Sequence, residues 1–296
     1  MTVFRRPLWF LLSVLLVVAC EGDRSRVAAD TSHPPAARII TLAPNLTELV
    51  FSAGAGSRLV GVVEYSDFPP AALKLPRIGD AFRLDQEAIA ELDPDLILAW
   101  NSGTPREVIA RLDRLGYRVV ALDTGTFDGV ADSLRLIGRL AGTEKSAVAA
   151  ADAFENSLDS IRGQMAGRAP IRVFYQVSAH PLFTISRRHI IGEAIELCGG
   201  VNAFDELPGL SSPVSVEAVI DAVPEVIIAG RSAGEGTAGA DSLALWREWT
   251  SIPAVREGNL FFVDADVLHR SSVRILDGVR ELCGRISAAR EKRSGS

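Results

Sequence analysis

The longest regular pattern of apolar and polar residues lies in the middle of the chain and predicts one long helix. Apolar residues recur there three or four positions apart, which keeps them on one face of a helix for about five turns. These residues are Ala147, Ala151, Phe154, Leu158, Ile161 and Met165. Thr143 and Glu144 favour a capped start, and Gly167 with Pro170 favours a stop. Such a helix of roughly 24 residues would be about 36 Å long and could join two lobes.

The segments before and after this helix resemble each other. Residues 84–100 (LDQEAIAELDPDLILAW) align with residues 214–230 (VSVEAVIDAVPEVIIAG) without a gap. Each copy predicts a helix, a turn at proline and a buried strand. Because many α/β proteins contain such units, chance similarity stays open as an alternative. We favour two equivalent lobes joined by one helix.

Outside the repeat, short apolar runs alternate with amphipathic segments, which is typical of α/β proteins. In the first half, we expect strands at 39–42, 59–63, 77–82 and 118–122, and helices at 47–53, 106–115 and 130–141. In the second half, we expect strands at 173–177, 183–186 and 260–263, helices at 189–198, 243–249 and 272–287, and a mobile loop at 233–240. The predicted fold is α/β, with Rossmann-like lobes at 38–142 and 169–290 and a rigid helix at 143–168.

The amino-terminal residues form a pattern typical of a bacterial lipoprotein signal peptide at 1–20. Arg5 and Arg6 precede a short apolar run, and small residues precede Cys20. About 12 apolar residues are too few to cross a bilayer of roughly 30 Å. We expect lipidated Cys20 to hold the chain on the outer side of a membrane, in the periplasm or at the cell surface, through a flexible tether at 21–37.

Charge and cysteine content narrow the possible partners. The chain has 31 Lys+Arg against 37 Asp+Glu, a net charge of −6, and no basic cluster, so we expect no nucleic acid partner. With Cys20 lipidated, Cys198 and Cys283 remain as an even pair. In an oxidising compartment they are expected to form a disulfide, with two buried free thiols as the alternative.

The sequence contains no pattern typical of a catalytic or metal site. It has no nucleophile elbow, phosphate loop or HExxH motif. His180, His189 and His269 are dispersed along the chain. We therefore expect no enzyme activity, metal or resident cofactor.

Aromatic residues follow the predicted strands of the first lobe. Tyr65, Phe82 and Trp100 all stand at such strand ends. In parallel sheets, ligand-binding loops lie beyond the carboxyl ends of the strands. This arrangement predicts a cleft that binds a large, partly flat ligand through apolar contacts and a few polar groups.

Four segments resemble the periplasmic cobalamin-binding proteins that serve vitamin importers. They are 65–70 (YSDFPP), 96–100 (LILAW), 198–202 (CGGVN) and 274–276 (RIL) followed by Cys283. The resemblance extends over 38–286. It implies a substrate-binding fold of two lobes joined by a rigid helix, in which lobe closure is small.

The resemblance also implies ligand contacts. Tyr65 and Trp100 match the family's aromatic contacts, Phe82 stands where the cobalamin binder has tryptophan, and Phe183 matches in the second lobe. Residues 210–213 (LSSP) lack the family's tryptophan.

A second group of implied contacts follows the last predicted strand. Val267, after Asp266, stands where the family has another aromatic residue. Asp266 and Arg270 would contact polar substituents of the ligand, with a surface salt bridge as the alternative.

The resemblance implies a monomeric, non-enzymatic receptor that delivers cobalamin or a related corrinoid to an ABC importer made of a permease dimer and ATPase subunits. Because several aromatic contacts are altered, cobinamide, haem and ferric siderophores stay open as ligands. A tetrapyrrole-handling enzyme or sensor is the rival from a different class. Glu87 and Glu217, equivalent in the repeat, would dock against permease arginines, or else serve only as helix-start acids.

Overall fold

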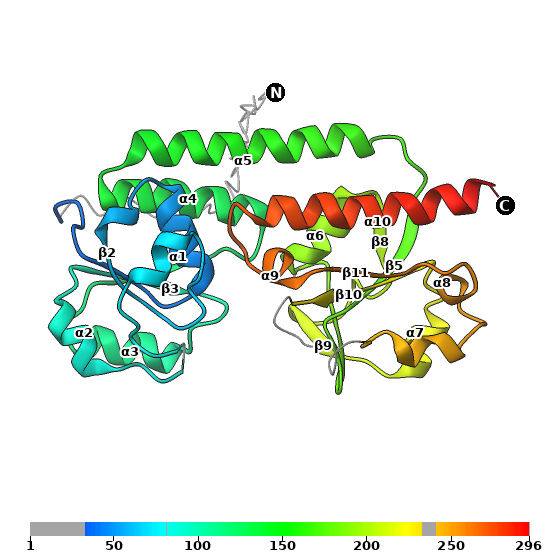
Figure 1. Cartoon of the computed structure of the whole chain (residues 1–296), viewed down its shortest axis with the longest axis horizontal. Helices are drawn as coiled ribbons and strands as arrows, with labels where there is room; N and C mark the ends of the chain where they lie inside the picture. Colours follow the sequence, from blue (N-terminus) through cyan, green and yellow to red (C-terminus); the bar gives the residue numbers. More distant parts are fainter. Residues whose placement is uncertain (1–32, 81, 233–240, 296) are drawn as a thin grey trace, which may run out of the picture.

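The computed structural model consists of two lobes that lie side by side beneath one long helix, α5 (Glu144–Met165) (Figure 1). The structure describes residues 33–80, 82–232 and 241–295. The predicted signal segment with Cys20 and the loop predicted at 233–240 lie outside the described residues. No described helix is both long enough and apolar enough to cross a membrane.

The first lobe contains a four-stranded parallel sheet in the order β2-β1-β3-β4. Its strands are β1 (Ile39–Thr41), β2 (Leu59–Val62), β3 (Leu96–Trp100) and β4 (Val119–Leu122). Alternate residues of β3 belong to two buried clusters, one on each face of the sheet. Both faces are therefore covered, which explains why the central strands are continuous apolar runs.

Helices of the first lobe cover these two faces. One face packs against α1 (Pro44–Ser52) and α4 (Phe127–Ala141), and the other against α2 (Gln86–Leu92) and α3 (Arg106–Arg114). Two short 3-10 helices, η1 (Gly56–Arg58) and η2 (Pro70–Lys74), lie in the connections. Packing begins before residue 38, because Ala36 is buried and its N–H donates to the carbonyl of Leu140.

The strand predicted at 77–82 is wrong. Among the described residues 77–80 and 82, only isolated bridges occur, from Val62 to Arg77 and from Gly79 to Leu84. Gly79 has a φ of +95°, and a Cβ at this position would lie 2.1 Å from the carbonyl oxygen of Arg83. The chain therefore turns back at Gly79 instead of extending along the sheet.

The long helix has the predicted apolar face, since Ala147, Ala151, Phe154, Leu158 and Ile161 are all buried. It packs against α4 of the first lobe and against α6 and α10 of the second. The predicted Thr143 cap is absent, because that side chain makes no capping hydrogen bond.

The largest buried cluster is continuous through both lobes. It runs from the first sheet through α4 and α5 to α6, α10 and the second sheet. The lobes therefore share a core beside α5, which restricts their relative motion.

The second lobe contains another four-stranded parallel sheet, in the order β11-β10-β5-β8. Its strands are β5 (Ile171–Gln176), β8 (Gly200–Asn202), β10 (Val226–Arg231) and β11 (Leu260–Asp264). One face packs against α6 (Ile190–Leu197) and α10 (Ile275–Gly295). The other packs against α7 (Val216–Asp221), η4 (Ala244–Glu248) and α8 (Pro253–Arg256).

Two features of the second lobe were not predicted. The strand predicted at 183–186 is present as β7 (Leu182–Ile185), but it lies in an antiparallel sheet of order β6-β7-β9 whose other strands, β6 (Ser178–Ala179) and β9 (Ser211–Pro213), were not predicted. A four-residue helix, α9 (Ala265–Leu268), joins β11 to the turn before α10. Strands β6 and β9 and helix α9 are too short to give a periodic pattern in sequence.

Two helix predictions differ from the structure. The helix predicted at 243–249 is the 3-10 helix η4, in which Trp246 is fully buried and its indole N–H donates to Gln176 Oε1 at 2.7 Å. The closing helix begins at Ile275 and continues past residue 287. The helix extends beyond the predicted end because Arg290 is buried and donates to the carbonyls of Cys198 and Ala169, which hold the last turns in place.

The internal repeat is present in three dimensions as α2-β3 and α7-β10. Asp85 and Ser215 cap the two helices, and each accepts the backbone N–H three residues further on. Asp93 and Val223, which follow the helices at equivalent positions, have φ values of +42° and +48°. Equal backbone strain at equivalent positions supports true repetition over chance similarity.

Cys198 and Cys283 form the predicted disulfide, with Cα atoms 4.7 Å apart. The bond joins the end of α6 to α10. Both sulfur-bearing residues are buried within the large shared cluster. The disulfide therefore crosslinks α6 to α10 within the core of the protein.

Candidate functional site

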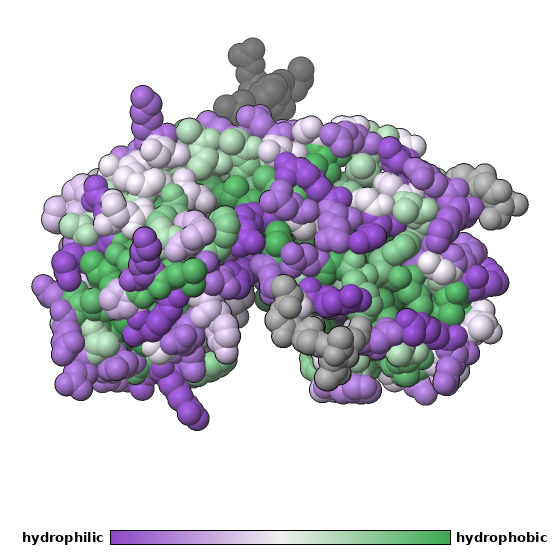
Figure 2. Space-filling view, viewed as in Figure 1, coloured by the Kyte–Doolittle hydropathy of each residue, from purple (hydrophilic) through white to green (hydrophobic). Residues whose placement is uncertain are grey.

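A deep notch separates the two lobes on the side opposite α5 (Figure 2). Loops from both lobes meet where Arg270, after α9, forms an ion pair with Asp67, after β2. These loops follow strands of the two parallel sheets, the usual position of ligand-binding residues.

The loop after β2 is held by a buried anchor at Ser66. Ser66 is fully buried; its hydroxyl accepts the Thr47 hydroxyl at 3.2 Å, and its carbonyl accepts from Arg77 Nη2 at 3.0 Å. Tyr65, beside this anchor, has a φ of +62° and is 78% exposed. The anchor therefore holds Tyr65 outward in a conformation that non-glycine residues rarely adopt.

Trp100, the last residue of β3, lies against a turn. Its backbone N–H donates to Thr104 Oγ1 at 3.0 Å, and its ring lies so close to Gly103 that a Cβ there would be 2.0 Å from Cε3. The side chain is partly buried. Its indole Nε1 is shielded from solvent and has no hydrogen-bond partner among the described residues. The turn thus fixes the position of the ring.

Phe82 lies on a tight turn and is 71% exposed. Asp80 Oδ1 accepts the backbone N–H groups of Phe82 and Arg83, both at 2.8 Å. These two donors lower the pKa of the Asp80 carboxyl. The charged form therefore supports the turn that presents Phe82.

In the second lobe, Phe183 lies in β7 and is partly exposed. Strand β9 pairs with β7 and places Pro213 opposite Phe183. The segment in which the resembled family carries tryptophan is therefore adjacent to Phe183. Leu210, at the start of that segment, is 40% exposed, so an aliphatic side chain is available there in place of an aromatic one.

Asp266 lies in α9, and Arg270 lies just after this helix. Asp264 caps this short helix and accepts the backbone N–H of Asp266 at 2.9 Å. Arg270 follows the helix after His269 and directs its guanidinium toward the first lobe, where it binds Asp67.

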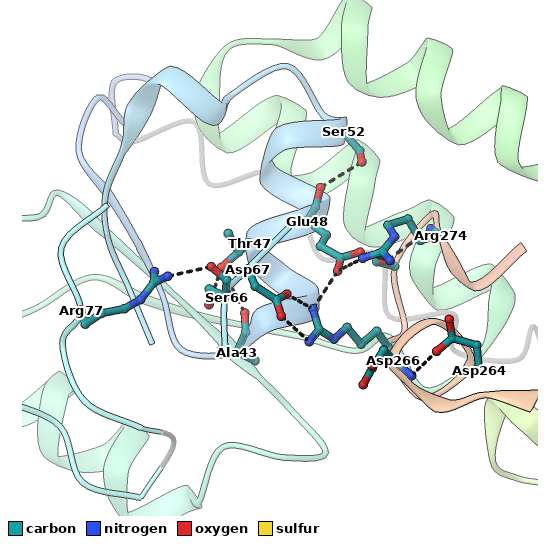
Figure 3. Close-up of polar contacts among 12 residues, drawn as sticks. Ala43, Thr47, Glu48, Ser52, Ser66, Asp67, Arg77, Asp264, Asp266 and Arg274 are labelled. Carbon is teal, nitrogen blue, oxygen red and sulfur yellow. Dashed lines mark hydrogen bonds and ion pairs between the residues drawn. The ribbon is translucent and has the colours of Figure 1, made fainter. Parts of the chain in front are cut away.

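Four charged residues form a cluster between the two lobes, which we call the inter-lobe ion cluster: Glu48, Asp67, Arg270 and Arg274 (Figure 3). Asp67 binds Arg270 through both carboxylate oxygens, and Glu48 Oε1 binds Arg274 Nη1 at 3.0 Å and Arg270 Nη1 at 3.3 Å. The Arg270 hydrogen bond lowers the pKa of Asp67. The pair therefore stays ionised at neutral pH.

Sequence analysis missed Glu48. It is 3% exposed within a helix whose residues 45–50 are all buried. The available signal was an acidic residue inside the otherwise uncharged segment 44–53 (PNLTELVFSA), because buried charges need partners.

Two of the histidines have structural hydrogen-bond partners. His189 caps α6, accepting the N–H of Ile191 at 3.1 Å, and burial lowers its pKa to about 4. His269 bonds the Tyr175 hydroxyl at 2.7 Å. Within the described ranges, no group of three or more His, Cys, Asp or Glu residues could hold a metal ion.

A cavity of about 550 Å³ lies away from the notch, between the start of α4, the second half of α5 and α6. In it, Glu193 accepts the backbone N–H of Phe127 at 2.9 Å, and burial raises the pKa of that carboxyl. None of the predicted ligand contacts lines this cavity. We therefore take the open notch between the lobes as the candidate ligand site.

Comparison with known sequences gives matches over most of the chain. The periplasmic binding protein family matches residues 39–267. The vitamin B12-binding protein of Vibrio cholerae is 36% identical over 259 residues, which cover 87% of this chain and 92% of that protein. The vitamin B12-binding protein of Pectobacterium carotovorum is 32% identical over 253 residues, 85% of this chain and 88% of that protein.

Solved structures have the same fold. The crystal structure of the periplasmic vitamin B12 binding protein BtuF of Vibrio cholerae has a TM-score of 0.78 at 37% identity, covering 86% of this chain and 98% of that one. The periplasmic heme binding protein HutB of the same species has a TM-score of 0.73 at 22% identity, covering 84% and 98%. At that identity, the second likeness concerns the fold alone.

Proposed function

This chain belongs to the periplasmic binding protein family, and we propose that it captures a corrinoid in the notch between its lobes and delivers it to an ABC-type importer. The observation that carries this proposal is the 36% identity to a vitamin B12-binding protein over nearly the full length of both chains. Its relatives are binding proteins and not enzymes.

The notch suits a corrinoid chemically. A corrin ring has two broad apolar faces and a rim of amide substituents, so it needs aromatic surfaces together with a few hydrogen-bonding groups. Tyr65, Phe82 and Trp100 would supply the surfaces from the first lobe, and Phe183 from the second. Arg270, which pairs with Asp67 across the lobes, would donate to rim amides, and Asp266 would accept from them.

Delivery requires a second surface. Glu87 and Glu217 are exposed in the first turns of α2 and α7, the equivalent helices of the repeat. A pseudo-symmetric pair of acids suits docking on a two-fold symmetric permease dimer. We also propose that lipidated Cys20 holds the monomeric protein at the membrane on its periplasmic or outer side.

The binding experiment that tests the corrinoid proposal is an equilibrium titration of the purified protein with cobalamin, cobinamide, haem and ferric siderophores. We expect the two corrinoids to bind and the others to bind far more weakly. Because the tryptophans expected near 210–213 and at Val267 are absent, discrimination between the two corrinoids should be weak. Tight binding of haem or a siderophore alone would instead support the alternative receptor function.

Removal of one ring should weaken binding measurably. A ring that stacks on a corrin contributes about 1 kcal/mol beyond its buried area, so Trp100→Ala should raise the corrinoid Kd by more than about tenfold. Trp249→Ala is the matched control, since Trp249 is 38% exposed but follows η4. Isothermal titration of both folded variants measures the effect. An unchanged Kd for Trp100→Ala would show that Trp100 only packs against the core and does not contact the ligand.

A further inference from the structure

We propose that Glu48 is a positioning residue for the ligand notch, which acts from the first lobe through Arg270 and Arg274 of the second. It directs both guanidinium groups and sets the separation of the lobes. This inference rests on the proposed function, in which Arg270 contacts the ligand.

The burial of Glu48 requires the second lobe. Its carboxylate is 3% exposed, and a buried carboxylate strongly destabilises a fold unless donors surround it. Among the described residues, the side-chain partners of this carboxylate are Ser272, Arg270 and Arg274. All three belong to the turn between α9 and α10. The charge is therefore satisfied only while the lobes keep their present relation.

The turn after α9 is built around this carboxylate. Ser272 donates its backbone N–H to the carbonyl of Arg270 at 2.7 Å, and its hydroxyl accepts the N–H of Arg274 at 3.3 Å. The same hydroxyl donates to Glu48 Oε2. Through this bond to Ser272, Glu48 therefore helps to hold the turn that carries both arginines.

Glu48 also decides where each guanidinium points. Arg270 binds two carboxylates, of which Glu48 is buried whereas the Asp67 side chain is 53% exposed. Arg274 lies 3.9 Å over the Phe68 ring and has Glu48 as its ion-pair partner. Without Glu48, Arg270 would have only Asp67, on an exposed loop, as its ion-pair partner. Arg274 would keep only its contact with the Phe68 ring.

A fixed arrangement of the lobes favours tight binding. When the contact groups of a site are already in place, less conformational entropy is lost as the ligand binds. The inter-lobe ion cluster contains two acids and two arginines, so its charges balance. Glu48 is the buried member that two of the cluster's ion pairs share.

A mutant cycle separates positioning from simple structural support. Glu48→Gln keeps the side-chain shape and removes the charge, and Arg270→Ala removes the ligand contact. We expect each single variant to raise the cobalamin Kd at least about tenfold, and the loss in the double variant to be smaller than the product of the two single losses. Glu64→Gln, at an exposed acid in the first lobe, should leave the Kd unchanged. Losses that multiply in the double variant would overturn the proposal.

A second measurement needs no ligand and therefore remains informative if corrinoid binding fails. Spin labels at Asp113→Cys in the first lobe and Glu248→Cys in the second report the distance between lobes. We expect one narrow distance distribution in the parent protein and in Glu64→Gln, and a broader one in Glu48→Gln. An unchanged distribution in Glu48→Gln would contradict the proposed control of lobe separation.

If Glu48→Gln folds poorly, a milder variant can be measured in its place. Ser272→Ala removes one donor to the same carboxylate, and it should broaden the distribution to a smaller extent. Parent protein that binds no corrinoid, together with a broadened Glu48→Gln distribution, would refute the proposed function and leave the positioning role intact.

Discussion

The double variant Glu87→Ala with Glu217→Ala should bind corrinoid as the parent protein does, yet lose ligand-dependent transport by its importer reconstituted in liposomes. Both acids are exposed and lie away from the inter-lobe ion cluster, so the notch should be unaffected. The backbone N–H of Glu217 and then the Ser215 hydroxyl donate hydrogen bonds that lower the pKa of the Glu217 carboxyl. It is therefore anionic at neutral pH and available to pair with a permease cation.

The repeat offers a matched control for this experiment. Glu91 and Asp221 occupy equivalent positions near the ends of the same two helices, and both are exposed. Glu91→Ala with Asp221→Ala changes the net charge by the same amount. Transport should persist in this control. Full transport by the Glu87 and Glu217 double variant would show that the two acids do not dock. They would then serve only as helix-start residues, which the helix dipole favours.

Removal of the disulfide should cause the largest loss of stability. Cys198 and Cys283 are 85 residues apart in sequence, and closing a loop of that length stabilises a fold by about 4 kcal/mol in the chain-entropy model. Cys198→Ser with Cys283→Ser should therefore lower the thermal midpoint of unfolding by roughly 10 °C. Differential scanning calorimetry measures this shift.

Hydrogen bonds of Arg290 should keep the disulfide-free variant folded. Arg290 still donates to the carbonyls of Cys198 and Gly199 in the variant, so α6 and α10 should keep their contact in the folded state. The folded structure should therefore persist at 25 °C. Adding a reducing agent should shift the midpoint of the parent protein and leave that of the variant unchanged. A shift below about 2 °C in the serine variant would mean that the crosslink adds little.

Long and repeated features were predictable from sequence. The α5 apolar face extends over many turns, and the repeat places equivalent helices and strands in both lobes. Such patterns remain visible because each contains many residues that obey one period. Tyr65 and Trp100 could be proposed as site residues because each stands at a strand end.

Short elements and contacts between distant residues were not predictable. Glu48 and Ser272 are 224 positions apart, so no local pattern indicates that they meet. A strand was wrongly predicted at 77–82 because this segment contains apolar and aromatic residues, yet the backbone turns at Gly79. Strand β9 is defined by its backbone pairing with β7, a partner that lies elsewhere in the sequence. In each case tertiary contacts decide the structure.

The position of cobalt in a crystal of the protein grown with cobalamin tests the binding proposal most directly. Anomalous scattering at the cobalt absorption edge locates the metal independently of any assumed ligand pose. We expect one cobalt peak between the lobes, with the corrin ring against Tyr65 and Trp100 and its rim within reach of Arg270. A peak in the cavity between α5 and α6, or no peak from a crystal soaked at saturating cobalamin, would contradict corrinoid binding in the notch.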